Sequence, residues 1–234
     1  MKNGAIDVID AFKEVVGEEG TLVFPTFTIS NSMYETLTDK EQFFDVNLSK
    51  STVGAITNCF LQQDNTYRSV HPTHSVAAWG KHASFIVKDH FVAETNFGKG
   101  TPFGKMMELN GKIVGLGISY GPVTYYHVYE DLNLNLFPNV YFPDRIKVKC
   151  RDSKGLIQES DFLCHNPEFH KKRIDKDAEI ESFFSDYFEK KNISKKTKIG
   201  QGSVWWMNAE NLITELTSLH KKNITIYSVK NGQK

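Results

Sequence analysis

Three residues in one short segment have the types and the spacing of an acid–base pair with a neighbouring hydroxyl. Thr124, His127 and Glu130 stand three residues apart in Thr124-Tyr-Tyr-His-Val-Tyr-Glu130, so a helix would carry them on one face. A histidine can take a proton from a nucleophile near neutral pH, and a nearby carboxylate can hold its tautomer and stabilise the cation that forms. The spacing makes His127 a candidate general base. A helical histidine that only packs or forms hydrogen bonds is the alternative.

A second polar segment, residues 68–75, crowds a cation, two imidazoles and three hydroxyls together. Its polar side chains are those of Arg68, Ser69, His71, Thr73, His74 and Ser75. Such a group could grip the phosphates of a cofactor or a polar acceptor. The alternative is a hydrogen-bonded turn beside a core strand. Pro72 disfavours a helical conformation for the residue before it, so loop and strand are expected here.

The surroundings of these candidates disfavour three other chemistries. Ser75 and His127 could suggest a serine hydrolase, but Ser75 does not lie in a Gly-x-Ser-x-Gly elbow. His71 and His74 have no carboxylate or cysteine at short range, so no metal site is expected. The glycines within residues 115–117 lack the third glycine of the dinucleotide fingerprint, which argues against a nicotinamide cofactor.

Helices and strands must position these candidates. Apolar residues recur at helical spacing over residues 5–16, and residues 21–24 have the pattern of a buried strand. Thr26 follows at the carboxyl end of that strand, where open α/β sheets bind ligands. Further helices are predicted at 51–62, which Ser51 or Thr52 could cap, and at 81–90, 124–132 and 209–219. Strands are predicted at 112–117 and 224–229, and an antiparallel hairpin at 140–150 and 156–164. A loop is predicted at 98–104, and a charged helix end or loop at 186–198. These patterns predict an α/β fold with a mixed central sheet flanked by helices and an antiparallel hairpin in the C-terminal half.

Composition limits the class of protein. The chain has 234 residues and carries 28 lysines and arginines against 28 aspartates and glutamates. No overall charge therefore favours nucleic acid or an anionic membrane as a partner. The chain has no run of about 20 apolar residues, so no membrane span is expected. Charged residues among the first twenty argue against a signal peptide, and the three cysteines are widely spaced. These features indicate a cytoplasmic protein. One domain is expected for this length.

Five segments, in order, resemble the aminoglycoside 3-N-acetyltransferase family. They are Gly20-Thr-Leu-Val-Phe-Pro-Thr-Phe27, Arg68-Ser-Val-His-Pro-Thr-His-Ser75, Thr101-Pro-Phe-Gly104, Gly111-Lys-Ile-Val-Gly-Leu-Gly117 and the triplet of Thr124, His127 and Glu130. Each segment is weak alone, but five in the family's order make a specific match. The C-terminal half resembles the family more loosely, through the hairpin and residues 200–206.

The resemblance implies one acetyltransferase domain over residues 1–234, with acetyl-CoA as co-substrate and no metal. The acetyl group would pass directly to an amine of a small-molecule acceptor, an aminoglycoside antibiotic or an amino sugar, with His127 as general base and Glu130 orienting it. The residues that the resemblance puts on the CoA side are Thr26, Arg68, Ser69 and Phe103. Those that it puts on the acceptor side are His71, His74, Ser75 and Thr124.

The resemblance has one departure and leaves two alternatives. Family members usually carry a further N-terminal segment whose strand, ending in a Val-His-Ser-Ser-like sequence, helps to hold CoA, and this chain is expected to lack it. One alternative is a non-catalytic sugar- or nucleotide-binding protein of the same fold, although such a protein has no need of a base. A serine hydrolase is the other. The sequence also leaves a homodimer open.

Overall fold

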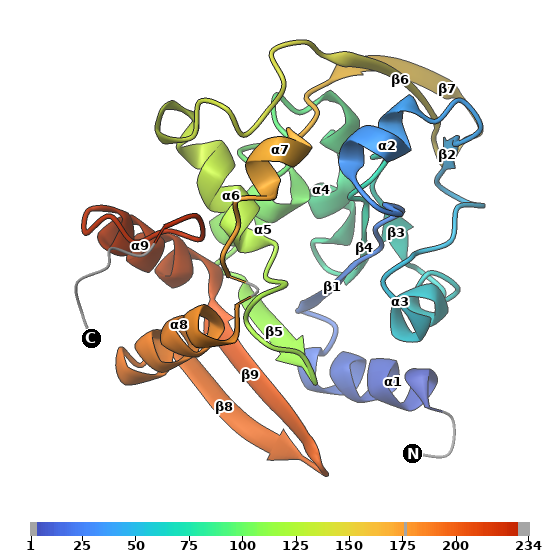
Figure 1. The fold of residues 1–234 in the computed structure, drawn as a ribbon. Coiled ribbons are helices and arrows are strands. Elements are labelled where there is room, and N and C mark those ends of the chain that lie inside the picture. The colour runs from blue at the N-terminus through green and yellow to red at the C-terminus, as the bar shows by residue number, and fades with distance from the viewer. Residues whose placement is uncertain (1–3, 176, 229–234) are drawn as a thin grey trace. The chain divides into compact units, whose positions relative to one another are not determined.

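The computed structural model describes residues 4–175 and 177–228 (Figure 1). The chain divides into two compact units, one formed by the residues up to Lys105 with Tyr141–Pro167 and the other by Met106–Val140 with the residues from Glu168 onward. The described strands form three three-stranded sheets. The α/β class is therefore confirmed, but the strands predicted to form one central sheet belong to separate sheets. None of the helices that the structure describes has the length and the apolar character of a membrane span. That the chain is one domain stays a prediction.

Unit 1, the first of these, contains two sheets. Its helices are α1 (Ala5–Val16), α2 (Met33–Thr38), α3 (Ala55–Phe60), α4 (Ala83–Val87) and the short 3₁₀ helix η1 (His90–Val92), and α5 (Pro102–Glu108) and α7 (Pro167–His170) extend over its boundaries. Its strands are β1 (Thr21–Pro25), β2 (Phe44–Asp45), β3 (Tyr67–Arg68), β4 (Val76–Gly80), β6 (Ile146–Arg151) and β7 (Ile157–Phe162). One sheet has the antiparallel order β1-β4-β3. In the other, β2 is parallel to β6, and β6 is antiparallel to β7.

The first helix follows its prediction closely. α1 covers the predicted residues 5–16 and ends at Gly17, which has a positive φ of 68° that favours glycine. The Gly17 amide donates to the Lys13 carbonyl at 2.9 Å and so closes the last turn. The apolar face of α1 packs on α3 and β1 around the fully buried Ile9 and Phe60. This packing holds β1 in place.

Backbone pairing beyond β1 brings the segment 68–75 to Thr26. The Thr26 amide donates to the Ser75 carbonyl at 2.8 Å, and the Thr28 amide donates to the Thr73 carbonyl at 2.9 Å. The loop-and-strand character that was predicted for this segment is confirmed by β3 and β4. Thr26 and the polar segment therefore lie side by side, just beyond the paired ends of β1 and β4.

The helix predicted at 51–62 is shorter than expected. α3 begins only after Gly54, which occupies the N-cap position, so neither Ser51 nor Thr52 caps it. The Thr52 hydroxyl is engaged elsewhere, because it donates to the Ile29 carbonyl at 2.9 Å. The hydroxyl that was expected to cap the helix ties two loops together instead.

Two neighbouring predictions also need correction. The helix predicted at 81–90 is divided into α4 and η1. The loop predicted at 98–104 contains the start of α5, because Pro102 suits the first position of a helix. The Thr101 hydroxyl accepts the Gly104 amide N–H at 3.3 Å and so satisfies a donor of the first turn.

The antiparallel hairpin predicted at 140–150 and 156–164 is confirmed by β6 and β7, which are shorter than predicted. Its turn is closed by a bond of 2.9 Å from the Asp152 amide to the Leu156 carbonyl. The turn residues that interrupt the two apolar runs were therefore a reliable signal.

Unit 2, the second part of the chain, is built around one sheet. Its helices are α6 (Tyr125–Leu132), η2 (Leu134–Leu136), α8 (Ala178–Lys190) and α9 (Ala209–His220), and its strands are β5 (Lys112–Leu116), β8 (Ser194–Ile199) and β9 (Gly202–Asn208). The strands pair antiparallel in the order β5-β9-β8. α9 packs on α6 and β9, and α8 packs on β8 (Figure 1). The predictions of helices at 124–132 and 209–219 and of a strand at 112–117 are confirmed.

One prediction in unit 2 is confirmed only in part, and another is wrong. The stretch 186–198, predicted to be a helix end or loop, contains the end of α8 and most of β8, whose side chains are mostly exposed. The predicted strand at 224–229 is a turn over residues 224–228, with a bridge between Thr225 and Ser228, and Val229 lies outside the described residues. The charged sequence did not predict β8, because this strand is stabilised by its pairing with β9 and not by an apolar pattern of its own.

Gly115 of β5 leaves room for the Trp205 ring of β9. A Cβ at Gly115 would lie 2.0 Å from Trp205 Cε2, and Trp205 is 2% exposed and donates from Nε1 to the Ile118 carbonyl at 2.8 Å. We expect Gly115→Ala to lower the free energy of unfolding by about 1–3 kcal/mol, the usual cost of overpacking. Urea denaturation of the variant and the wild type measures this difference in the free energy of unfolding. The control Gly202→Ala should change stability by less than about 0.5 kcal/mol, because its nearest neighbour atom is 3.5 Å away; equal effects would contradict the prediction.

Candidate active site

α6 brings His127 and Glu130 of the predicted triplet together. Thr124 occupies the N-cap position, and its carbonyl accepts the His127 amide N–H at 2.9 Å. The helical turn that follows places His127 Nδ1 2.7 Å from Glu130 Oε2. The His127 side chain is 15% exposed and that of Glu130 is 1% exposed. The imidazole is therefore the accessible member of a partly buried pair.

Arg173 determines which nitrogen of His127 carries the proton. Arg173 Nη1 lies 2.9 Å from His127 Nε2. A guanidinium only donates hydrogen bonds, so Nε2 must accept this one. The proton of the neutral imidazole is then on Nδ1, which donates it to Glu130. This is the tautomer that a general base needs if its lone pair is to be on Nε2.

Glu130 keeps its charge despite its burial. The Tyr227 hydroxyl donates to Glu130 Oε1. Burial by itself raises the pKa of this carboxyl, but attraction to His127 and hydrogen bonds from His127 and Tyr227 outweigh burial and hold the pKa of Glu130 below its ordinary value. Burial and the Glu130 charge raise the pKa of Tyr227 in turn, so its phenol remains a donor. A charged carboxylate therefore faces the imidazole.

Asp175 anchors Arg173 through two parallel bonds. Arg173 Nε lies 2.9 Å from Asp175 Oδ1, and Nη2 lies 2.6 Å from Oδ2. Burial alone lowers the pKa of Arg173, but its bonds to Asp175 and their opposite charges outweigh burial and raise it. The His170 ring stacks on that of His127 with centroids 5.0 Å apart. We call the bonded set the His127 network; its members are His127, Glu130, Arg173, Asp175 and Tyr227.

A metal ion fits this arrangement poorly. Ligand atoms of His127, Glu130 and His170 lie within 4.8 Å of one another, a spacing that a metal could use. However, Arg173 donates to His127 Nε2, so a cation bound there would face a guanidinium at short range. The charges favour a base over a metal ligand. The expected absence of a metal stays a prediction.

In unit 1, three of the predicted residues bond to one another. Thr26 Oγ1 lies 3.0 Å from Ser75 Oγ, and the Ser75 hydroxyl donates to the Thr26 carbonyl at 2.8 Å. Arg68 donates from Nε to Ser75 Oγ at 3.1 Å, from Nη2 to the Thr26 carbonyl at 2.9 Å, and from Nη1 to two further backbone carbonyls. Burial lowers the pKa of Arg68 to about 10, against an opposing attraction to Asp45. Thr26 and Ser75 are fully buried, and Arg68 is half-buried.

His71 and His74 are buried beside this cluster. His71 is fully buried and accepts at Nδ1 from the amides of Thr73 and His74, at 3.2 and 3.0 Å. Its Nε2 therefore carries the proton and donates to Asn96 Oδ1, 3.3 Å away. His74 is 8% exposed, and its Nδ1 lies 2.8 Å from Thr73 Oγ1. The alternative of a hydrogen-bonded turn beside a core strand describes these contacts well.

Burial lowers the pKa of His71 to about 3, against a hydrogen bond with Asn96 that raises it. Because the pKa is near 6.5 in the unfolded chain, the unfolded state takes up the proton first. The contribution of neutral His71 to stability is complete above pH 6.5 and is lost as the pH falls toward 3, by about 1.4 kcal/mol per pH unit. We expect His71→Asn to give a shallower loss of unfolding free energy between pH 6.5 and 4 in urea titrations. Parallel curves for the variant and wild type would contradict this.

Ser69 and Phe103 lie in the same buried region. The Ser69 hydroxyl accepts the Val76 amide N–H at 2.9 Å and contacts His90 Nδ1, also at 2.9 Å. Phe103 packs on Phe97, with ring centroids 5.4 Å apart, and is 3% exposed. Burial also lowers the pKa of His90 well below its ordinary value. Both predicted residues therefore support the interior of unit 1 more than its surface.

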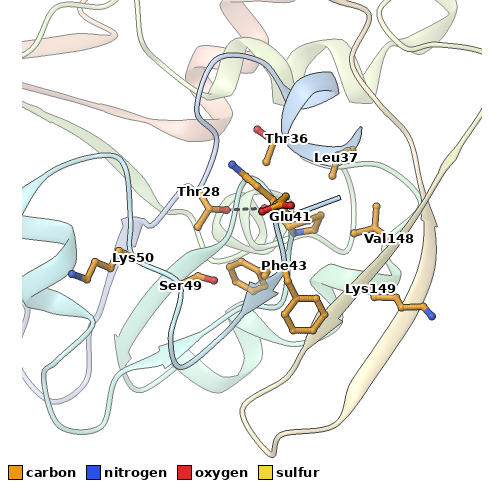
Figure 2. A pocket seen from close by; sticks show the side chains of 12 residues that line it. Thr28, Thr36, Leu37, Glu41, Phe43, Ser49, Lys50, Val148 and Lys149 are labelled. Atoms are coloured by element: carbon orange, nitrogen blue, oxygen red, sulfur yellow. Dashed lines mark hydrogen bonds between the residues drawn. The ribbon is translucent and has the colours of Figure 1, made fainter. Parts of the chain in front are cut away.

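Unit 1 also contains a cavity of about 320 Å³ that the predicted site residues do not line (Figure 2). Figure 2 shows Thr28, Glu41 and Phe43 close together, with Lys50 and Lys149 toward opposite edges. The Thr28 hydroxyl donates to the Pro72 carbonyl at 2.7 Å. The volume of this cavity is in the range of small-molecule sites, roughly 300–1,000 Å³. The cavity combines an aromatic wall with charged groups of both signs.

One Gly-x-Ser-x-Gly spacing does occur in the sequence, at Gly117-Ile-Ser-Tyr-Gly121 between β5 and α6. An α/β-hydrolase elbow sets its serine on a sharp turn that leads from a strand directly into a helix. Ser119 is exposed, and α6 begins only at Tyr125. The His127 ring nitrogens bond to other members of its network. This geometry gives no support to a hydrolase.

A family model for aminoglycoside 3-N-acetyltransferase matches residues 1–220. The chain belongs to this family. The match includes the five segments on which the resemblance was based, together with α8 and β8, which the sequence motifs did not identify.

Two curated relatives in the family match part of the chain. The SPbeta prophage-derived aminoglycoside N(3')-acetyltransferase-like protein YokD of Bacillus subtilis is 28% identical in a match that covers 56% of this chain and 53% of the relative. The aminoglycoside N(3)-acetyltransferase III of Serratia marcescens is 28% identical in a match that covers 56% of this chain and 52% of the relative. The chain thus spans about half the length of the curated relatives it matches.

Solved structures of aminoglycoside acetyltransferases have the same fold. AAC-IIIb in a binary complex with CoASH has a TM-score of 0.73 and 20% identity, covering 97% of this chain and 87% of that one. A mutant of AAC(3)-IVa in complex with gentamicin has a TM-score of 0.71 and 21% identity, covering 98% of this chain and 79% of that one.

The sequence motifs of this family member did not reveal every member of the His127 network. Arg173, Asp175 and Tyr227 are separated from His127 by 46 residues or more. The close pair Arg173-Ile-Asp175 is the one sequence signal that could have drawn attention to them, because a buried guanidinium needs a carboxylate. Its connection to His127 depends on the fold of unit 2.

Proposed function

We propose that this member of the aminoglycoside 3-N-acetyltransferase family transfers the acetyl group of acetyl-CoA to an amine of an aminoglycoside or amino sugar, with His127 as general base. The observation that carries the proposal is the 2.7 Å contact between His127 Nδ1 and the buried carboxylate of Glu130. Family membership and the CoASH complex of AAC-IIIb support acetyl-CoA as donor. The gentamicin complex of AAC(3)-IVa supports an aminoglycoside as acceptor. Because acetyl-CoA is a cytoplasmic metabolite, we propose that the protein acts there.

The base is needed because a sugar amine is protonated at neutral pH and has no lone pair with which to attack. His127 Nε2 takes one proton from the ammonium, and the freed lone pair of nitrogen attacks the thioester carbonyl carbon. An amide C–N bond forms and the C–S bond breaks. The second proton leaves the nitrogen for the CoA thiolate, and His127 returns its proton to solvent. The transfer is direct, without an acetylated side chain.

Glu130 places a buried negative charge beside His127. When Nε2 gains a proton, the imidazolium faces a carboxylate that is already charged and nearly excluded from water. Their attraction is stronger there than at the surface, because water does not screen it well. Thr124 sets the first turn of α6 and so positions the pair, and its hydroxyl is our candidate for a contact with the acceptor.

Arg68 is our candidate for a CoA contact in unit 1. It is half-buried, and it lines two cavities of about 390 and 320 Å³. Thr26, Ser69 and Phe103 are buried, so their proposed role on the CoA side is to hold the surrounding backbone. The buried acceptor-side candidates His71, His74 and Ser75 are proposed to act in the same indirect way.

Acetyl-CoA binding by calorimetry, together with CoA thiol release in the presence of a panel of aminoglycosides and amino sugars, tests the function. We expect binding and acceptor-dependent thiol release, and we expect release to disappear in His127→Ala. Release with one class of acceptor would identify the substrate. Binding of a sugar without any thiol release would instead favour a non-catalytic binding protein of this fold. Ester hydrolysis blocked by a serine-directed inhibitor would favour a hydrolase.

A further inference from the structure

We propose that Arg173 occupies the position of the acceptor amine at His127 Nε2 and must be displaced before His127 can act as a base. This inference rests on the proposed function for its catalytic meaning. Its structural basis is the 2.9 Å contact between Arg173 Nη1 and His127 Nε2, which lies entirely within unit 2.

The two donors compete for one lone pair. Nε2 of a neutral imidazole has a single lone pair in the ring plane, and Arg173 Nη1 donates to it. An acceptor ammonium must donate to the same lone pair in order to pass on its proton. The guanidinium and the acceptor amine therefore cannot both bond to Nε2. Arg173 mimics the substrate because both present an N–H on a cation.

Proton uptake reinforces the displacement. Once Nε2 is protonated it becomes a donor, and the guanidinium has no lone pair to accept from it. Two positive charges would then face each other at the present separation of 2.9 Å. Asp175, 2% exposed, can hold Arg173 through two bonds after the contact to His127 is broken. The arginine can thus leave Nε2 without losing its counter-ion.

The position of Arg173 in the chain allows such a movement. It lies in the irregular segment between α7 and α8, not within a helix or strand. Its side chain is 12% exposed and that of His127 is 15% exposed, so neither partner is fully enclosed. We therefore assign Arg173 as a positioning residue, which keeps His127 in its Nδ1–H tautomer and covers the lone pair until an amine replaces it.

Modification of His127 in the free protein tests the contact without relying on activity. An unprotonated imidazole nitrogen attacks a carbonyl carbon of diethyl pyrocarbonate and is carbethoxylated as ethyl carbonate leaves, and mass spectrometry locates the product. We expect Arg173→Met to speed modification of His127 by about ten- to a hundredfold, the factor that a charged hydrogen bond contributes. Arg151→Met removes another arginine bonded to a buried aspartate, Asp45 at 3.1 Å, and should leave the rate unchanged.

Imidazole ¹⁵N chemical shifts give a second readout on the free protein. We expect the Nε2 resonance of His127 to move in Arg173→Met because its hydrogen bond is lost, and to stay closer to wild type in Arg173→Lys, which keeps an N–H donor. Unchanged shifts and an unchanged modification rate in a folded Arg173→Met protein would overturn the proposal. These results hold whether or not acetyl transfer is detected, so they are distinct from a failure of the proposed function.

Steady-state kinetics test the competition itself. If Arg173 competes with the acceptor, Arg173→Met should lower the KM for the amine by about tenfold and change kcat by much less. If Arg173 instead stabilised the transition state, kcat would fall with KM unchanged, and displacement would be wrong. Arg173→Lys should have a KM closer to that of wild type, because the lysine can still donate to Nε2.

Discussion

Replacing His127 with alanine is expected to lower the turnover of acetyl transfer by about a hundred- to ten-thousandfold, the usual contribution of a general base. The reason is the geometry of α6, in which the imidazole has a charged partner on Nδ1 and its lone pair on Nε2. Without a base, only the small neutral fraction of the acceptor amine can react. Thiol release with saturating acetyl-CoA and a range of acceptor concentrations measures the effect.

Controls separate this catalytic effect from a general loss of structure. His220→Ala removes another half-buried histidine of unit 2, whose Nδ1 lies 3.1 Å from the Tyr129 hydroxyl, and should leave turnover within about threefold of wild type. Acetyl-CoA affinity of His127→Ala should remain near that of wild type, because the base acts on the acceptor. Added imidazole should restore part of the lost activity. Turnover of His127→Ala within about threefold of wild type would show that His127 is not the base.

The sequence was most informative where local patterns decide structure. The helical spacing of residues 5–16 and 124–132 and the turn between β6 and β7 depend on neighbouring residues, and all three predictions are confirmed. The contact between His127 and Glu130 belongs to the same class, because one helical turn brings them together. The central element of the candidate site could therefore be predicted from spacing alone.

Long-range pairing explains what the sequence did not reveal. β8 carries a lysine-rich, mostly exposed run that resembles a solvated loop, and it is a strand because β9 pairs along its whole length. Arg173 and Tyr227 reach His127 and Glu130 only through the packing of unit 2. No local pattern connects them, since their separations in the chain are 46 and 97 residues.

The polar segment 68–75 shows how composition can mislead. Its cation, imidazoles and hydroxyls have the chemistry of a ligand site, yet His71 and Ser75 are fully buried and bond to protein groups. Buried polar groups need partners, and a cluster of them can satisfy one another. A similar composition would fit an exposed binding loop. Burial, which the sequence does not give directly, distinguishes the two.

Glu130→Gln is expected to lower turnover by about ten- to a hundredfold and the free energy of unfolding by about 1–3 kcal/mol. The amide removes the negative charge that faces the imidazolium, and it cannot serve as two charged acceptors for His127 and Tyr227. The effect on turnover should be smaller than that of His127→Ala, because the base itself remains. Thiol release and urea denaturation measure the two quantities.

The pH dependence of the Glu130→Gln effect distinguishes a charged partner from a merely well-packed one. The folded state holds the pKa of Glu130 below its ordinary value of 4.5, so its charge stabilises the fold fully above that value and the contribution is lost as the pH falls through the lower folded pKa. The stability difference between wild type and Glu130→Gln should therefore be constant near neutral pH and shrink below about pH 4.5.

Glu215→Gln is the matched control, since Glu215 accepts from the Tyr187 hydroxyl at 2.9 Å but does not contact a histidine. This substitution should leave turnover unchanged. A stability difference that persists unchanged into acid would mean that shape and not charge makes Glu130 important, and the electrostatic role that we assign to it in proton uptake by His127 would be wrong.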